Sequence, residues 1–150
     1  MLSAVLDYGN SFDYTFEQEV LSLRDWSRLL HAGKIARKSK HRFRLGCVVV
    51  KSKRVYATAV NKAKSHPELF PNRMSVHAEI AALSKMQDAQ GATVYVARLG
   101  QTEDTFRVAL PCLYCIDVML TRGITKVVCT LDDNTAVSFK LSSVKSSYLV

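Results

Sequence analysis

The sequence predicts a mixed α/β fold in which helices and strands alternate along the chain. Short Val-rich runs, such as residues 46–50 and 126–130, have the length and β-branched composition of buried strands. Longer segments with apolar residues at helical spacing lie between such runs, and capping residues or prolines stand at their starts. With 150 residues, the chain is long enough for a full hydrophobic core, and we expect a single domain over residues 1–150.

Each element has its own local signal. The first helix is expected from about residue 22 to residue 38, because Ser22 and Asp25 form the S-x-x-D pattern of a capping box. Residues 1–14 show no clear periodicity, and residues 1–21 are interpreted as an N-terminal extension. The later elements are, in order, strands 46–50 and 55–60, a loop 62–74, a helix that begins near Val76, a strand 93–97, a loop 98–110, a helix that begins at Pro111, and strands 126–130 and 136–144.

The last strand, residues 136–144, is expected to run antiparallel to the strand before it. Apolar and polar residues alternate from Val137 to Leu141, which is typical of a half-buried strand. Only residues 131–135 separate the two strands, whereas a parallel connection needs a dozen or more residues.

Two short motifs carry the candidate chemistry, His77-Ala78-Glu79 and Pro111-Cys112-Leu113-Tyr114-Cys115. One imidazole and two thiolates provide three ligands for a tetrahedral Zn²⁺, and an open fourth position is typical of a catalytic site. At about 100° per residue, Cys112 and Cys115 lie about 60° apart on a helix, so both can bind one ion. His77 and Glu79 lie about 200° apart, so they can serve one ion only if it lies beyond the N-terminal end of their helix.

Both motifs are accordingly predicted at helix starts. Ser75 is a good N-cap ahead of Val76, and Pro111 suits the first turn of the second helix. Gly123 suits the C′ position of that second helix. The positive ends of the two helices would favour thiolate over thiol.

The motif pair H-x-E and P-C-x-x-C resembles that of the cytidine/deoxycytidylate deaminase superfamily of zinc-dependent nucleobase deaminases. A similarity in element order extends over residues 24–130. The resemblance implies a three-layer α/β/α cytidine deaminase-like fold with a five-stranded mixed sheet. It also implies that His77, Cys112 and Cys115 bind zinc, while Glu79 moves protons as general acid and base without binding the metal. An antiparallel last strand resembles the nucleoside deaminase and bacterial toxin branch of that superfamily.

The same resemblance implies substrate contacts. Asn61 ends a predicted strand where deaminases place an Asn that contacts the sugar, although it could instead be a turn residue. The backbone amide of Ala78 matches the position that meets the base carbonyl. His66 lies in a loop expected near the zinc, where it would contact phosphate or sugar, or serve a local structural role.

The net charge of +8 is concentrated in residues 24–64, which hold thirteen Lys and Arg against the single acidic residue Asp25. The densest part runs from Lys34 to Arg44, and Lys38, Lys40, Arg42 and Arg44 in it are expected to face solvent. Such a cluster can attract the phosphate of a nucleotide or a nucleic acid. The alternative is a solvated helix end.

The leading hypothesis is a zinc-dependent hydrolytic deaminase that converts cytosine to uracil in a nucleoside or nucleotide, acting as a homo-oligomer. One alternative is an editing deaminase that acts on cytosine or adenine in single-stranded DNA or RNA, which the basic segment 24–64 favours. Another is a non-enzymatic zinc-stabilised binding module, whose fourth ligand would be Cys47, Cys129 or His66. Cys47 and Cys129 lie in Val-rich runs and look like small core residues instead.

The composition also indicates the compartment. No segment approaches the length of a membrane span, and acidic residues near the N-terminus are unlike a secretory signal. Four cysteines, of which two are assigned to a metal, fit a reducing interior better than a disulfide scaffold. We therefore expect a cytoplasmic protein without a membrane partner.

Overall fold

A computed structural model describes residues 2–5, 14–63 and 75–146 of the chain. Within these residues, eight strands form one mixed sheet in the order β1-β2-β10-β9-β7-β3-β4, with β8 paired to β7. The strands are β1 (Leu2–Val5), β2 (Thr15–Glu19), β3 (Arg44–Lys51), β4 (Arg54–Val60), β7 (Thr93–Leu99), β8 (Phe106–Arg107), β9 (Lys126–Thr130) and β10 (Ala136–Lys140). Two short strands, β5 (Lys62–Ala63) and β6 (Ser75–Val76), pair with each other separately.

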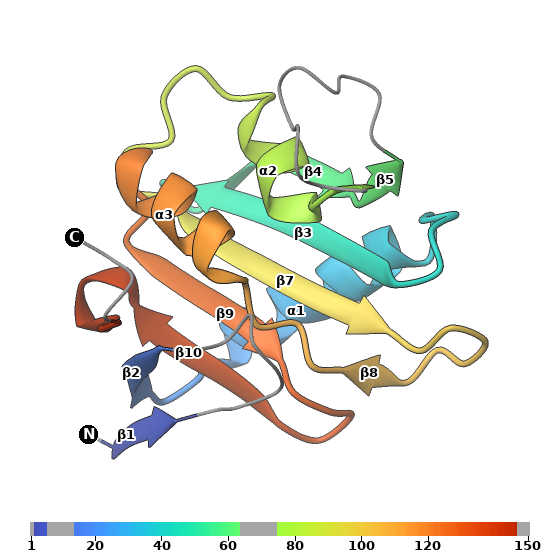
Figure 1. The fold of residues 1–150 in the computed structure, drawn as a ribbon, viewed down its shortest axis with the longest axis horizontal. Coiled ribbons are helices and arrows are strands. Elements are labelled where there is room, and N and C mark those ends of the chain that lie inside the picture. Colours follow the sequence, from blue (N-terminus) through green and yellow to red (C-terminus); the bar gives the residue numbers. More distant parts are fainter. Residues whose placement is uncertain (1, 6–13, 64–74, 147–150) are drawn as a thin grey trace.

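Helices cover both faces of the sheet. The helix α1 (Leu23–Ala36) packs on one face, and α2 (Ala78–Leu83) and α3 (Leu113–Thr121) lie on the other, as Figure 1 shows. The predicted three-layer α/β/α fold is therefore confirmed. None of the described helices has the length and apolar character needed to cross a lipid bilayer.

The strand pairing agrees with the expectation for the end of the chain. β9 pairs with β7 in parallel and with β10 in antiparallel register, with Val137 opposite Cys129. The final strand is shorter than predicted, because β10 ends at Lys140 and a 3₁₀ helix (Leu141–Ser143) follows. The Ser143 hydroxyl donates a hydrogen bond to the Lys140 carbonyl at 2.7 Å, and such local serine bonds compete with strand pairing.

The segment interpreted as an N-terminal extension contributes to the sheet. β2 pairs with β10, and β1 pairs with β2. Phe16 of β2 is buried, and its ring stacks on that of Phe139 at a centroid distance of 4.2 Å. With β8, these strands enlarge the predicted five-stranded sheet to eight strands within the described residues.

Two apolar layers form the core, one on each face. Along β7, Val94 and Val96 pack on the α2/α3 face, while Tyr95 and Ala97 pack on the α1 face. Gly46 allows α1 to approach the sheet closely, because a Cβ atom at this position would clash with the backbone of α1 at Ala32 and Ala36.

A capping box begins α1, as predicted. The Asp25 amide donates to the Ser22 hydroxyl at 3.1 Å, and the Ser22 amide donates to the Asp25 carboxylate at 3.0 Å. The helix ends at Ala36, two residues before the predicted end. The buried Asp25 carboxylate also accepts hydrogen bonds from the Tyr95 hydroxyl at 2.9 Å and from the Lys126 ammonium at 3.2 Å.

These partners determine the charge state of Asp25. Burial by itself raises the pKa of the Asp25 carboxyl, but the hydrogen bonds from the Ser22 amide, Tyr95 and Lys126 outweigh it, so the pKa lies below its ordinary value. A depressed carboxyl pKa adds stability above the unfolded-state pKa, and this stability is lost as the pH falls through the folded-state pKa.

We expect the free energy of unfolding of wild type to fall as the pH drops below about 4, with Asp25 as one cause. The difference in unfolding free energy between wild type and Asp25→Asn should be largest near pH 7 and should shrink in acid. Urea unfolding at a series of pH values measures it, with Asp117→Asn on the exposed side of α3 as the control. A difference that stays constant from pH 7 to pH 2 would contradict the assignment.

Candidate active site

The two motifs lie at the N-terminal ends of α2 and α3, and the motif residues themselves serve as the N-caps. His77 is the N-cap of α2, and its carbonyl accepts the Ala81 amide at 3.0 Å. Cys112 is the N-cap of α3, and its carbonyl accepts the Ile116 amide at 2.9 Å. The prediction of two helix starts is confirmed.

The predicted capping residues are wrong. Ser75 belongs to β6, where the backbone pairs with Ala63 of β5, so the chain is extended at this point. Pro111 lies before the N-cap of α3, not in its first turn. Gly123 follows the C-cap Arg122 with φ +79°, which confirms its predicted C′ position.

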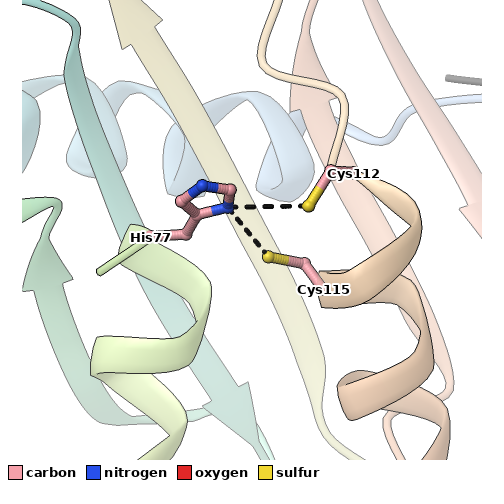
Figure 2. A group of neighbouring side chains, drawn as sticks. All are labelled: His77, Cys112 and Cys115. Atoms are coloured by element: carbon pink, nitrogen blue, oxygen red, sulfur yellow. Dashed lines mark hydrogen bonds between the residues drawn. The ribbon is translucent and has the colours of Figure 1, made fainter. Parts of the chain in front are cut away.

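The three predicted zinc ligands meet between the two helix starts. His77 Nδ1 lies 3.2 Å from Cys115 Sγ and 3.6 Å from Cys112 Sγ. Figure 2 shows the imidazole, ahead of α2, facing both sulfur atoms at the start of α3. All three ligand atoms lie within 4.8 Å of one another.

This geometry fits zinc. Tetrahedral bonds of about 2.3 Å to sulfur and about 2.0–2.1 Å to nitrogen place the two ligand atoms about 3.6 Å apart. The observed separations of 3.2 and 3.6 Å are close to that value. His77, Cys112 and Cys115 form the one group of three or more metal-ligating side chains within the described residues. The part of the chain described by the structure thus brings together three side chains that could hold one metal ion.

The four cysteines divide into two classes. Hydrogen bonding to Cys115 lowers the pKa of the Cys112 thiol to about 4, since this bond and the contact with His77 outweigh the opposing effect of burial. Burial raises the pKa of Cys47 and of Cys129, which are completely enclosed in the core. These two cysteines are therefore core residues, as predicted, and they lie outside the candidate metal group.

Glu79 lies in the first turn of α2, and only 3% of its surface is exposed. Burial raises the pKa of its carboxyl, and the nearby His77 only partly opposes this effect. His77 and Glu79 line the same cavity although they are two residues apart, because the cavity lies at the end of the helix, not along its side.

The cavity has a volume of about 340 Å³, within the usual range for small-molecule sites. One part of its wall is formed by His77, Glu79 and Cys112. The remaining wall comes from the loop before β3, the start of β3, the ends of β4 and β7, and the segment before α3. These residues are His41, Phe43, Leu45, Asn61, Arg98, Val108, Ala109 and Leu110.

Asn61 lines the cavity, but its side chain is also bonded to the loop before β3. Its Oδ1 accepts hydrogen bonds from the Ser39 hydroxyl at 2.8 Å and from the Leu45 amide at 2.9 Å. Its Nδ2 donates to the Phe43 carbonyl. The buried Asn61 therefore holds the loop of residues 39–45 against the cavity, and any sugar contact would be additional to this role.

Of the other two predicted substrate residues, Ala78 and His66, the structure describes only Ala78. Ala78 is the first residue of α2, between the cavity residues His77 and Glu79. An amide at this position has no partner within its own helix. His66 lies outside the described residues.

Some residues of the basic cluster form ion pairs, and others are exposed without one among the described residues. Arg44 donates to the carbonyls of Gly100 at 2.6 Å and Glu103 at 2.9 Å, and pairs with Asp104 at 3.1 Å. The expectation that Arg44 faces solvent is therefore wrong, because the turn after β7 brings these acceptors over it. Arg37 pairs with the same Asp104 at 3.3 Å. Four basic residues of the cluster are exposed without an ion pair among the described residues, namely Lys34, Lys38, Lys40 and Arg42.

Sequence reasoning missed Tyr14, which reaches the site from the N-terminal segment. Its buried hydroxyl donates a hydrogen bond to the Pro111 carbonyl at 2.7 Å, immediately before Cys112. Burial raises the pKa of Tyr14, and the neighbouring Cys129 and Glu79 raise it further. No local pattern links a tyrosine at position 14 to a carbonyl 97 residues away.

The family model of the cytidine and deoxycytidylate deaminase zinc-binding region matches residues 25–131, which is more than half of the chain. The chain belongs to this deaminase family. No curated protein matches the chain in sequence.

Solved structures share the fold of this deaminase. The dCMP deaminase of the cyanophage S-TIM5 in its apo form is 21% identical, with a TM-score of 0.58, over 75% of this chain and 86% of that one. The same enzyme in complex with dCMP and dUMP is 22% identical, with a TM-score of 0.57, over 74% and 83%. A mutant cytidine deaminase from Mycobacterium tuberculosis is 18% identical, with a TM-score of 0.50, over 78% and 91%.

The deaminase should purify with about one zinc ion per chain, and Cys112→Ala should lose or weaken the metal, because two ligands hold zinc less well than three. Elemental analysis of protein prepared without chelators measures the ratio. Cys129→Ala removes a buried thiol outside the metal group and should keep the zinc. Metal-free wild type would contradict the assignment.

Tyr14→Phe should weaken zinc binding by about tenfold or more, because groups that support metal ligands have effects of this size. It should also destabilise the fold by about 1–3 kcal/mol through the buried Pro111 carbonyl left without its partner. Competition with a chelator measures zinc affinity. Tyr95→Phe, on the opposite face of the sheet, should affect stability but not zinc affinity. Equal effects of both variants on zinc would reject a role for Tyr14 at the site.

Proposed function

We propose that the chain is a zinc-dependent hydrolytic deaminase that converts cytosine to uracil in a nucleoside or nucleotide. The observation that carries the proposal is the placement of Glu79 beside the three-ligand group, on the wall of a single cavity. A carboxylate at the metal but outside the ligand set is what a hydrolytic deaminase requires. A purely structural zinc site would use four protein ligands.

His77, Cys112 and Cys115 would hold the zinc, with two thiolates and one neutral imidazole as donors. When bound there, zinc supplies a Lewis acid that lowers the pKa of water towards 7. The segment from Ala109 to Pro111 is buried, and the Tyr14 hydroxyl holds it through the Pro111 carbonyl, so the cysteines start from an ordered support.

Glu79 would move the protons of the reaction. It takes a proton from the attacking water and delivers it to the ring nitrogen next to the carbon that bears the amine. It then passes the second proton of the water to the departing amine, which leaves as ammonia. The ring carbon gains an oxygen and loses its amino group, so cytosine and water become uracil and ammonia. The burial of Glu79 keeps other water from competing for these transfers.

Two observations support cytosine in a small substrate. The chain shares its fold with structures of a dCMP deaminase and a cytidine deaminase. The antiparallel pairing of β9 and β10 resembles the nucleoside deaminase branch. In this proposal the Ala78 amide meets the base carbonyl and Asn61 lies towards the sugar. We further infer a homo-oligomer, and the cysteine usage supports a cytoplasmic location.

A second candidate function is the editing of single-stranded nucleic acid. It is favoured by the exposed ring of Phe43 at the cavity, with the Arg42 guanidinium 5.4 Å from the ring centroid and two exposed lysines, Lys38 and Lys40, nearby in sequence. An aromatic ring among cations is a typical surface for stacked bases and phosphates.

Glu79→Ala should retain zinc and lose deamination by about 10²–10⁴-fold, because Glu79 transfers protons and does not bind the metal. Ammonia release and product mass should be measured on cytidine, deoxycytidine, their monophosphates, adenine compounds and single-stranded oligonucleotides. Glu17→Ala, an exposed carboxylate on β2, is the control. Conversion confined to oligonucleotides would favour the editing function, and substantial activity in Glu79→Ala would reassign the acid/base role.

A further inference from the structure

Arg98 stands out among the arginines near the cavity because, within the described residues, a buried nitrogen of its guanidinium has no partner. Three others form ion pairs, Arg37 and Arg44 with Asp104 and Arg107 with Glu103. Within the described residues, no carboxylate lies within ion-pair distance of Arg98. Its Nε is buried and has no hydrogen-bond partner there. A buried donor without a partner is rare in native structures and requires an explanation.

The sheet register places Arg98 on the face of the sheet that α2 and α3 cover. Along β7 the side chains alternate, so Arg98 points to the same face as Val94 and Val96, which pack in the α2/α3 layer. Arg98 lies directly opposite Leu45 of β3, and both residues line the cavity that contains Glu79. The unpaired guanidinium therefore faces the site, not the solvent behind the sheet.

The surroundings of Arg98 favour an anion. Its guanidinium lies 4.9 Å from the ring centroid of Phe43, and the cationic Arg107 is its partner across β7 and β8. His41, which also lines the cavity, accepts the Phe43 amide at Nδ1 at 3.1 Å. This bond leaves the proton of the neutral imidazole on Nε2, which makes His41 a second donor. The cavity thus has the carboxyl group of Glu79 on one part of its wall and cationic and donor groups at Arg98 and His41 on another.

We propose that Arg98 binds the phosphate of the substrate, so that the substrate is a nucleoside monophosphate and not an uncharged nucleoside. This inference rests on the proposed deaminase function and specifies its substrate class. The planar guanidinium offers two parallel N–H donors to phosphate oxygens. The base then lies at Glu79 and the metal ligands, and the phosphate lies at the carboxyl end of β7.

Arg98→Gln tests the inference. It should raise KM for a pyrimidine nucleoside monophosphate by about ten- to a hundredfold, the range for loss of a charged hydrogen bond, and should leave the nucleoside almost unchanged. Arg98→Lys should recover part of the loss, because it keeps the charge without the planar fork. The matched control is Arg54→Gln, which removes the same charge from an exposed position at the start of β4, outside the cavity, and should leave both KM values unchanged.

Equilibrium binding tests the phosphate site independently of deamination. Calorimetry with uridine and with uridine monophosphate needs no turnover, so an Arg98-dependent preference for the monophosphate would support the phosphate site even if no substrate is deaminated. Equal losses for nucleoside and nucleotide in Arg98→Gln would overturn the proposal. An effect of Arg98→Gln on single-stranded oligonucleotides alone would place the phosphate in a polymer and overturn the mononucleotide assignment.

Discussion

The site depends on the approach of two helix starts on one face of the sheet, where the His77 imidazole meets the sulfur atoms of Cys112 and Cys115. The topology causes this meeting. α3 lies in the crossover between β7 and β9, which are parallel neighbours and therefore need a long connection over one face. α2 lies in the connection from β4 to β7 and packs on that same face. Ligands 35 residues apart in sequence can then share one ion because both helices begin at the same end of the layer.

The cavity beside the ligands has two chemically different parts. Glu79 and Cys112 contribute carboxylate and thiolate groups, whereas Arg98 and His41 contribute donors from the end of β7 and the loop before β3. Asn61 connects these parts, since its side chain bonds three groups of that loop and leaves little freedom for the loop to move. Such an arrangement suits a ligand with a polar ring at one end and an anion at the other, and it is held by bonds that are independent of any ligand.

The N-terminal segment contacts the backbone next to the site. Phe16 stacks on Phe139 and anchors β2 to β10, and Tyr14 continues from β2 towards the Pro111 carbonyl. Arg44 likewise stabilises the backbone near the cavity. Its guanidinium donates hydrogen bonds to the Gly100 and Glu103 carbonyls and pairs with the Asp104 carboxylate, all in the turn after β7. Tyr14, in the predicted extension, and Arg44, in the basic cluster, thus each hold a backbone segment next to the cavity.

The sequence by itself determined the features that lie within one element or between adjacent elements. The spacing of His77, Glu79, Cys112 and Cys115 indicated the metal group and its end-on geometry, Ser22 and Asp25 predicted the cap of α1, and the short connection before β10 predicted antiparallel pairing. Only the tertiary structure decided that β2 joins β10, that Tyr14 reaches Pro111 and that Arg44 binds the turn after β7. The same is true of Arg98, whose buried Nε has no partner among the described residues. The physical reason is range: helix and strand periods and turn lengths act over a few residues and can be read locally. The partner of a buried polar group depends on which strands become neighbours, and no local pattern contains that information.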